Sequence, residues 1–438
     1  MWPEGEGSLF ASLFLVAAVV LVGIASAALA RRLPARIAAP ADSAPREPGR
    51  HAALQGFRGL LAFGVFMHHS FIWSRYARGH GWVDAALFHQ FGESRVVLFY
   101  MLTATLFYGR LLDARGRGLD WLKLYVSRLL RLGPAYWFAM LLMFAAIAWA
   151  TVHHIDGAGM SGMTYSWTEI LAQCGAWMGF SMLGMPSIDG YLPTPVVVAA
   201  VTWTLPYECV FYLLLPLLAL PLRVKMPATT LGIGLAAAVW LAAWSPDPAL
   251  CVPFAGGFAV AQVMRVPRVA ALLRTRAAAL AAMLAMTVAV LAFPTMYAPL
   301  PILLLLFSLA VVACDNDLFG LLAWRAPQAL GQWAYSLYML HGVALYTMFM
   351  LVIGPERAAR LGDWQYAGVI AACVPVVLAL SWASQRWIES PPMRAVPAVV
   401  AALRRLAARV RKPQGVATAV VVPLAVHAAV PPSERRAA

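Results

Sequence analysis

The sequence predicts an all-α polytopic membrane protein, with about ten core transmembrane helices and one extra N-terminal helix around a polar cavity. Three observations predict this fold class. Hydrophobic residues make up 62% of the 438 residues and charged residues only 12%, about half the share in soluble globular proteins. Apolar runs long enough to cross a bilayer recur along the chain. The 33 Lys and Arg residues lie mostly at the ends of these runs, so we expect a lipid bilayer and no nucleic acid as partner.

The chain divides into three parts. Residues 1–50 are expected to hold the extra N-terminal transmembrane helix, at 9–30, and a cytoplasmic linker. The run 9–30 is too long for the apolar part of a signal peptide and follows no basic stretch, so we expect it to remain in the protein. Residues 51–395 form the membrane domain. Residues 396–438 are basic, and their apolar run 416–430 is broken by proline, so they predict an amphipathic or disordered cytoplasmic tail.

Within the membrane domain the apolar runs predict ten spans. They lie at about 55–73, 94–112, 132–152, 196–220, 228–245, 250–264, 277–294, 298–314, 329–353 and 366–388. The run 250–264 is short, so we expect a kinked or partly re-entrant helix there. Residues 168–185 contain Glu169 and Gln173, and they are interpreted as a re-entrant or interfacial helix because a full span there would invert every later segment.

The distribution of cations predicts the orientation. With eleven spans, the N-terminus outside and the C-terminus in the cytoplasm, 28 of the 33 Lys and Arg residues are cytoplasmic. The other five are expected on the outer side: Arg75, Arg78, Arg95, Arg357 and Arg360. The opposite orientation would reverse this ratio. We therefore expect a multi-pass protein of this orientation.

The stretch 55–73 carries three polar residues in a run long enough to span a bilayer: Arg58, His68 and His69. Polar groups in hydrocarbon are costly and usually mark a functional site. Arg58 and His69 lie within ~20° of one helix face and ~16 Å apart along the axis, so this stripe is expected to line a polar cavity. His68 points elsewhere and is interpreted as structural. Alternatively, Arg58 is an interfacial anchor and His69 a helix–helix hydrogen-bonding residue.

Further polar residues interrupt other spans. Arg128 and Arg131 are three residues apart at the predicted cytoplasmic end of a span, where two guanidinium groups on one face can hold phosphates; alternatively they are topological anchors. Glu208 is expected to pair with a cation or to face a water-filled cavity. The alternative is that its ion pair has only a structural role. His341 is a second intramembrane imidazole, with a structural role as the alternative. Glu389 is expected to be a helix-end charge at the cytoplasmic face.

Several short sequence motifs occur in this chain in the same order as in a known protein family. They are LQGFRGLLAFGVFMHH with Arg58 and His69, RVVLFYMLTATLFY, SRLLRLGPAYW with Arg128, Arg131 and Tyr136, WTLPYECVFYLLLP with Trp203 and Glu208, WAYSLYMLH with His341, and ESPPMR. In this set the chain resembles the acyltransferase-3 family of integral membrane acyltransferases, over residues 52–395. The chain departs from the family at Gln55, where the family has Asp, at Thr103 and Ala104 in place of Ser-Gly, and at Thr204 in place of Ser.

The resemblance implies a bacterial cytoplasmic (inner) membrane O-acyltransferase. It would move an acyl group, an acetyl group in the simplest case, from cytoplasmic acyl-CoA to a hydroxyl of a cell-envelope saccharide or glycolipid. Acyl-CoA is then a substrate, and no bound cofactor is expected. No metal site is expected either, because the five cysteines are scattered without a CxxC pair or a cluster with histidine. The oligomeric state and the acceptor are not readable from the sequence.

The resemblance also implies roles for individual residues. Arg128 and Arg131 would hold phosphates of the donor, and Arg58 another phosphate or the donor carbonyl. His69 would be the general base for the acceptor hydroxyl. Glu208 would orient an imidazole, balance its charge or bind the sugar. Three further candidates are His341, Tyr136 and Trp203.

Two rival functions use the same residues. A proton-coupled transporter or flippase would employ the Arg, His and Glu residues as a relay, and a membrane scaffold would carry them without a role. Arg128 and Arg131 favour the acyltransferase over the transporter, since a transporter needs no phosphate clamp. The sequence also lacks the internal repeat of many transporters. Direct transfer and transfer through an acyl-histidine both remain open.

Overall fold

The computed structural model describes residues 52–79, 81–82, 86–155, 164–244 and 247–411. The predicted N-terminal helix lies outside the described residues. Within these ranges the chain is helical, with no β-strand and two isolated β-bridges. The chain separates into two compact units, Met1–Val396 and Pro397–Ala438. The all-α fold class is therefore confirmed for the part that the structure describes.

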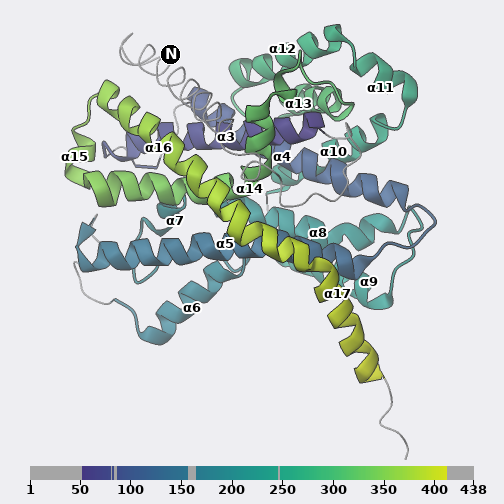
Figure 1. Ribbon diagram of the computed structural model, residues 1–438, viewed down its shortest axis with the longest axis horizontal. Coiled ribbons are helices and arrows are strands. Elements are labelled where there is room, and N and C mark those ends of the chain that lie inside the picture. Colours follow the sequence, from purple (N-terminus) through teal and green to yellow (C-terminus); the bar gives the residue numbers. More distant parts are fainter. Residues whose placement is uncertain (1–51, 80, 83–85, 156–163, 245–246, 412–438) are drawn as a thin grey trace, which may run out of the picture. The chain divides into compact units, whose positions relative to one another are not determined.

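The helices follow the predicted spans closely (Figure 1). In chain order they are α3 (Ala52–Tyr76), α4 (Ala86–Asp113), α5 (Trp121–Val152), α6 (Trp167–Met178), α7 (Thr194–Val197), α8 (Leu205–Ala219), α9 (Ala228–Trp244), α10 (Val252–Val263), α11 (Pro267–Leu273), α12 (Arg276–Ala292), α13 (Pro299–Ala313), α14 (Arg325–Tyr346), α15 (Pro355–Ala359), α16 (Asp363–Ser384) and α17 (Ser390–Arg411). Short 3₁₀ segments are η2 (Val201–Thr204), η3 (Pro248–Cys251) and η4 (Leu321–Ala323), and π-helical segments are η5 (Thr347–Ile353) and η6 (Gln385–Glu389).

Five helical stretches in the described part are long and apolar enough to cross a membrane, as expected of a multi-pass membrane protein. They are His89–Asp113, Trp121–Val152, Val201–Ala219, Arg325–Ile353 and Asp363–Arg409. A sixth is possible if η3 and α10 count together with α11, from which they are bent by 106°. α3 is not among them, although its 25 residues reach ~37 Å, because its polar residues interrupt the apolar run. The count of about ten core spans stays a prediction.

The structure shows the form of two segments that the sequence singles out, residues 168–185 and the start of the predicted tail. The 12 residues of α6 reach only ~18 Å, too short to span, which agrees with the re-entrant or interfacial interpretation of 168–185. A capping box starts α6, in which Ser166 and Glu169 hydrogen-bond to each other's backbone N–H groups. The Ser166 hydroxyl and backbone N–H hold the pKa of Glu169 below its usual value. In the predicted tail, α17 continues to Arg411, which agrees with the amphipathic alternative for this part, and residues 412–438 lie outside the described residues.

α3 and α14 pack closely and run parallel. A side chain at Gly59 would meet the backbone of Pro327 and Gly331, and one at Gly331 would lie 2.0 Å from the carbonyl oxygen of Gln55. Only glycine lets the two backbones approach this closely. Near the other end of the same pair, His69 of α3 contacts His341 of α14. The glycine contacts therefore set which residues of the two helices meet further along.

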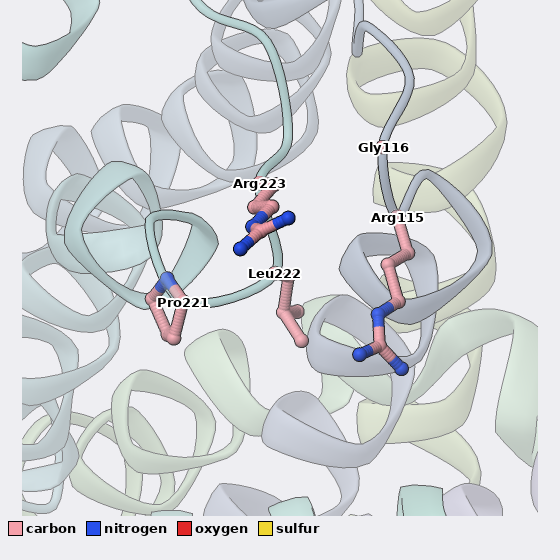
Figure 2. Close-up of a pocket in the computed structure, with 5 residues that line it drawn as sticks. All are labelled: Arg115, Gly116, Pro221, Leu222 and Arg223. Atoms are coloured by element: carbon pink, nitrogen blue, oxygen red, sulfur yellow. The ribbon is translucent and has the colours of Figure 1, made fainter.

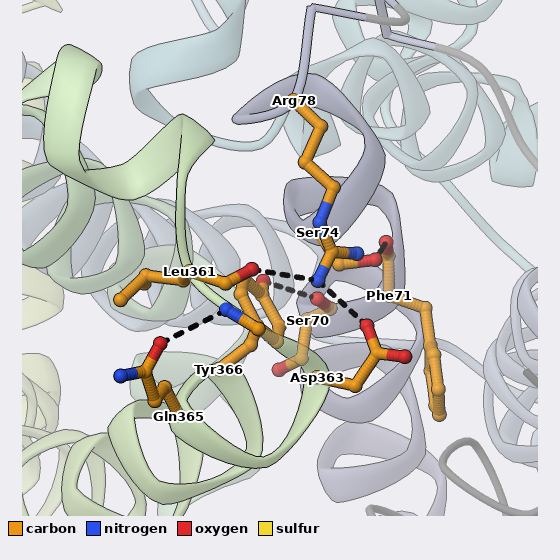
Figure 3. A network of polar contacts seen from close by, with 9 residues as sticks. Ser70, Phe71, Ser74, Arg78, Leu361, Asp363, Gln365 and Tyr366 are labelled. Carbon is orange, nitrogen blue, oxygen red and sulfur yellow. Dashed lines mark hydrogen bonds and ion pairs between the residues drawn. The ribbon is translucent and has the colours of Figure 1, made fainter. Parts of the chain in front are cut away.

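A polar network fixes the end of α3 beyond His69 (Figure 3). Arg78 donates to the carboxylate of Asp363 at 2.7 Å and to the carbonyl of Leu361 at 3.2 Å. The hydroxyl of Tyr366, from α16, donates to the carbonyl of Ser70 at 2.7 Å. These contacts tie the turn of α3 that carries His69 to the start of α16.

Candidate active site

The two intramembrane histidines of the sequence analysis meet in the structure. His341 Nε2 lies 3.0 Å from His69 Nδ1, and the ring centroids are 5.0 Å apart. His341 is fully buried, and its ring meets Phe66 edge-on. The structure thus places His341, predicted only as a further candidate, in direct contact with the predicted base.

The partners of the two rings determine their tautomers. His341 Nδ1 lies 3.0 Å from the carbonyl of Leu337, and His69 Nδ1 lies 3.0 Å from the carbonyl of Val65. Carbonyl oxygens only accept, so each Nδ1 carries the proton in the neutral ring. His341 Nε2 is then an acceptor that faces the Nδ1–H of His69. By this assignment the lone pair of His69 is on Nε2, where a general base needs it.

His69 lines a cavity of about 270 Å³, here called the His69 cavity. His68 joins it from α3, Glu93 from α4, Trp203 from η2 and Tyr338 from α14. The ring of Trp82 stacks on that of His69, with 22° between the planes and centroids 6.2 Å apart. Trp203, a predicted further candidate, therefore shares a cavity with His69. His68 does so too, and its ring packs directly against Gly92.

A second polar region lies around the predicted phosphate clamp. We call Arg58, Arg110, Arg128 and Arg131 the arginine cluster. Arg58 interacts electrostatically with Arg128, Arg131 and Glu208, and Arg128 with Arg110. The guanidinium groups of Arg110 and Arg128 each lie 5.0 Å from the ring centroid of Phe107. The structure therefore brings Arg58 into one site with the predicted pair Arg128 and Arg131.

Glu208 belongs to this cluster. Its carboxylate accepts a hydrogen bond from the Tyr212 hydroxyl, and its electrostatic partners are Arg128, Arg58 and Arg131. The predicted alternatives for Glu208 included orienting an imidazole, but the partner of His69 is His341. The structure therefore associates Glu208 with the arginine cluster.

Glu389 is the residue that sequence analysis misplaced. It is fully buried, accepts a hydrogen bond from Ser336 and lies 3.2 Å from Arg131 as an ion pair. It was expected to be a helix-end charge, but the π-helical segment η6 continues α16 and turns this residue inward. Helical spacing around Arg131 could not predict Glu389 as its partner, because the two residues are far apart in the chain.

The cluster keeps an excess of positive charge. Glu208 and Glu389 are two carboxylates against four guanidinium groups. Among the described residues Arg58 makes no hydrogen bond or ion pair, and the buried Nε of Arg128 has no hydrogen-bond partner. Uncompensated guanidinium groups at a polar site favour an anionic ligand such as a phosphate.

Tyr136, a further predicted site residue, does not line the His69 cavity. It is fully buried, its hydroxyl donates to the carbonyl of Trp177, and its ring stacks on Phe180. These contacts hold the turn after α6 against α5. The structure thus gives Tyr136 packing and hydrogen bonds to this turn, away from the residues that line the His69 cavity.

A further basic pocket lies where the loop after α4 meets the loop after α8 (Figure 2). Its volume is about 410 Å³, and Arg115 and Arg223 flank Leu222 there. The Gly116 N–H donates to the Leu222 carbonyl at 3.3 Å and joins the two loops. No predicted site residue lines this pocket.

Comparison with protein families identifies the chain. Residues 51–386 match a family model described as an acyltransferase domain of the acyltransferase-3 type, which is more than half of the chain. The chain belongs to the acyltransferase-3 family. It is therefore a multi-pass membrane acyltransferase, and the resemblance seen in the sequence is confirmed. The matched range includes His69, His341 and the whole arginine cluster, and it ends before Glu389. Comparisons with curated proteins and with solved structures find no match.

Proposed function

We propose that this acyltransferase moves an acetyl group from cytoplasmic acetyl-CoA to a hydroxyl of a cell-envelope saccharide or glycolipid in the bacterial inner membrane. The observation that carries the proposal is the His69–His341 pair beside a cavity, on the helix that also carries Arg58. A base with its lone pair on Nε2 next to room for an acceptor suits transfer to a hydroxyl.

The arginine cluster is the proposed donor site. Arg128 and Arg131 hold phosphates of CoA. Glu208 and Glu389 keep the guanidinium groups of these arginines in position. Arg58 lies ~16 Å along α3 from His69, too far to polarise a carbonyl that is attacked beside His69. Phosphate binding is therefore the proposed role of Arg58. The thioester end of the donor would extend from the cluster toward His69.

The reaction balances with these groups. The acceptor hydroxyl gives its proton to His69 Nε2 while its oxygen attacks the thioester carbonyl. The carbon–sulfur bond breaks, and the CoA thiolate takes the proton from the imidazolium. His341 accepts a hydrogen bond from His69 Nδ1–H throughout and stabilises the charge that forms on the ring.

The test is acetyl transfer by the purified protein. It is incubated with radiolabelled acetyl-CoA and fractions of the cell envelope, and the label is followed into saccharide and lipid. We expect label in a saccharide-containing fraction as an alkali-labile ester, with release of an equal amount of CoA. Release of CoA without labelled saccharide or glycolipid in any fraction would contradict the proposed acceptor class.

A further inference from the structure

The His69 cavity has the size and the walls of a site for one ring. Its volume of about 270 Å³ is just below the ~300–1,000 Å³ of typical small-ligand pockets. Aromatic side chains come from four separate places in the chain: Trp82, Trp203, Tyr297 and Tyr338. Flat aromatic faces pack well against the C–H faces of a sugar ring, and hydroxyl groups beside them give direction.

One carboxylate, that of Glu93, faces this cavity and is held on three sides. Its Oε2 accepts hydrogen bonds from the Met296 N–H at 2.8 Å and from the Thr295 hydroxyl at 3.2 Å. Its Oε1 lies 2.9 Å from His89 Nε2. The side chain of Glu93 is only 16% exposed. The fixed carboxylate keeps further acceptor capacity on its oxygens, since each has two lone pairs.

The described lining of the cavity carries no Lys or Arg. Its ionisable side chains are Glu93, three histidines and two tyrosines. An acceptor with its own carboxylate would face Glu93 with no guanidinium or ammonium group to compensate, which is unfavourable at a partly buried site. A neutral hydroxyl can donate to Glu93 in a charge-assisted hydrogen bond.

We infer that the His69 cavity is the acceptor subsite and that Glu93 is its specificity residue, which selects a neutral polyhydroxyl ring over an acidic one. Glu93 accepts one hydroxyl of the ring, and this contact presents another hydroxyl to His69. The inference rests on the proposed acetyl transfer and adds to it the class of acceptor. Sequence analysis missed Glu93 because it lies near a predicted helix end, where a charge is ordinary.

The test uses defined probes. Acceptor-stimulated release of CoA from acetyl-CoA is measured with methyl glycosides of neutral hexoses and with methyl glycosides of the corresponding uronic acids. For the wild-type protein we expect neutral glycosides to be used at least about tenfold better in kcat/KM, the equivalent of ~1.4 kcal/mol. In Glu93→Gln the KM for neutral glycosides should rise about tenfold or more, and the preference over uronic acids should shrink.

Control variants separate a loss of acceptor binding in Glu93→Gln from a loss of folding. Glu356→Gln removes an exposed carboxylate of α15 outside the cavity and should change no parameter. In Glu93→Gln the KM for the acceptor should rise more than the KM for acetyl-CoA, a difference that a merely structural loss would not produce. Thr295→Val removes one support of the carboxylate and should raise the acceptor KM less than Glu93→Gln does.

Three results would overturn the inference. One is a wild-type preference for uronic acid glycosides, and another is an acceptor KM in Glu93→Gln equal to that in Glu356→Gln. The third is no use of any neutral glycoside by protein that does acetylate an envelope saccharide. If no fraction and no glycoside accepts acetyl groups at all, the proposed function fails, and this inference fails with it.

Discussion

His341 helps to fix which nitrogen of His69 can act as a base, because it contacts His69 Nδ1 at 3.0 Å. Its own Nδ1–H is bound to the Leu337 carbonyl, so its Nε2 can only accept from His69. The carbonyl of Val65 accepts from the same Nδ1–H of His69, so the two partners together hold one tautomer of the ring. His341 is thus a positioning residue, because it acts on the acceptor through His69.

Replacement of His341 tests this role. His341→Ala should lower kcat about 10- to 100-fold, less than the ~10²–10⁴ expected for loss of the base itself, with little change in the KM for acetyl-CoA. The measurement is steady-state release of CoA with a saccharide-containing envelope fraction. His153→Ala, which removes an exposed histidine at the end of α5, serves as the control. A His341→Ala enzyme with wild-type kcat would contradict the positioning role.

At the residue scale the sequence predicted some partners and missed others. Helical spacing alone was enough to place Arg58 and His69 on one face of a single helix, because both residues share that helix. The contact between His69 and His341 depends on how two distant helices pack, and spacing holds no such information. The same reason hid the ion pair between Arg131 and Glu389.

At the scale of elements, close packing of α3 and α14 carries the site. Gly331 faces the backbone of Gln55, and any side chain there would push the helices apart. Because the histidine pair sits on the same two helices, a small displacement near Gly331 changes the geometry of the site. This packing explains glycines that sequence analysis treated only as part of apolar runs.

Gly331→Ala tests the packing. It should destabilise the protein by about 1–3 kcal/mol, as overpacking typically does, and should lower kcat as well. Gly368→Ala in α16 is the control, because a side chain there meets no other atom within 4 Å. That change should be neutral or stabilise by about 0.5–1 kcal/mol. Thermal unfolding in detergent measures both, and equal unfolding temperatures for the two variants would argue against the close contact.

The arginine cluster is assembled by α3, α4 and α5 around Glu208 of α8. Arg131→Ala would leave the fully buried Glu389 without its cation, so a loss of donor binding in that variant would be mixed with instability. Arg128 makes no ion pair among the described residues and is the cleaner target. The structure therefore moves the test of the phosphate clamp to Arg128.

Arg128→Ala should weaken acetyl-CoA binding about ten- to a hundredfold, the scale of a charged hydrogen bond of ~1.5–3 kcal/mol. Arg128→Lys should recover only part of the loss, because an ammonium group cannot make a two-pronged contact. Calorimetric titration of acetyl-CoA into solubilised protein gives the affinities. Arg404→Ala in α17 serves as a charge-matched control. Unchanged affinity in folded Arg128→Ala would return this residue to the role of a topological anchor and reopen the transporter alternative.

At the scale of the whole molecule, the two polar regions fall on opposite sides of the predicted topology. Trp82, Glu93 and Tyr297 line the His69 cavity and come from connections predicted to lie outside, and Leu250 lines it from the outer end of a predicted span. Arg110 and Arg128 come from the ends of spans predicted to face the cytoplasm. A donor from the cytoplasm and an acceptor from outside could therefore meet near His69. The polar cavity that the sequence predicts among the core helices stays a prediction over the distance between these two regions.

Reporter fusions test the topology. A fusion at residue 120, in the loop before α5, should be cytoplasmic, and a fusion at residue 358, in α15, should be outside. The expectation follows from the 28 cations that the predicted topology places inside against five outside. Location of both reporters on one side would break this topology and the assignment of the two cavity sides.

The fold class and most helix positions were predictable because apolar runs set them directly. The number of spans was less predictable, since α9, α12 and α13 are short and apolar and α10 bends sharply into α11. The His69 cavity was not predictable in detail, because its walls come from several loops and helix ends. Only folding brings Glu93 and Tyr297 beside His69.

The most direct test of the account is acetyl transfer by His69 variants. Wild-type, His69→Ala and His68→Ala proteins, each checked for folding and membrane insertion, are compared for transfer of labelled acetyl groups to a saccharide-containing envelope fraction. We predict a loss of ~10²–10⁴-fold in His69→Ala and substantial activity in His68→Ala. Wild-type transfer by His69→Ala, or its loss in His68→Ala alone, would contradict the assignment of His69 as the base.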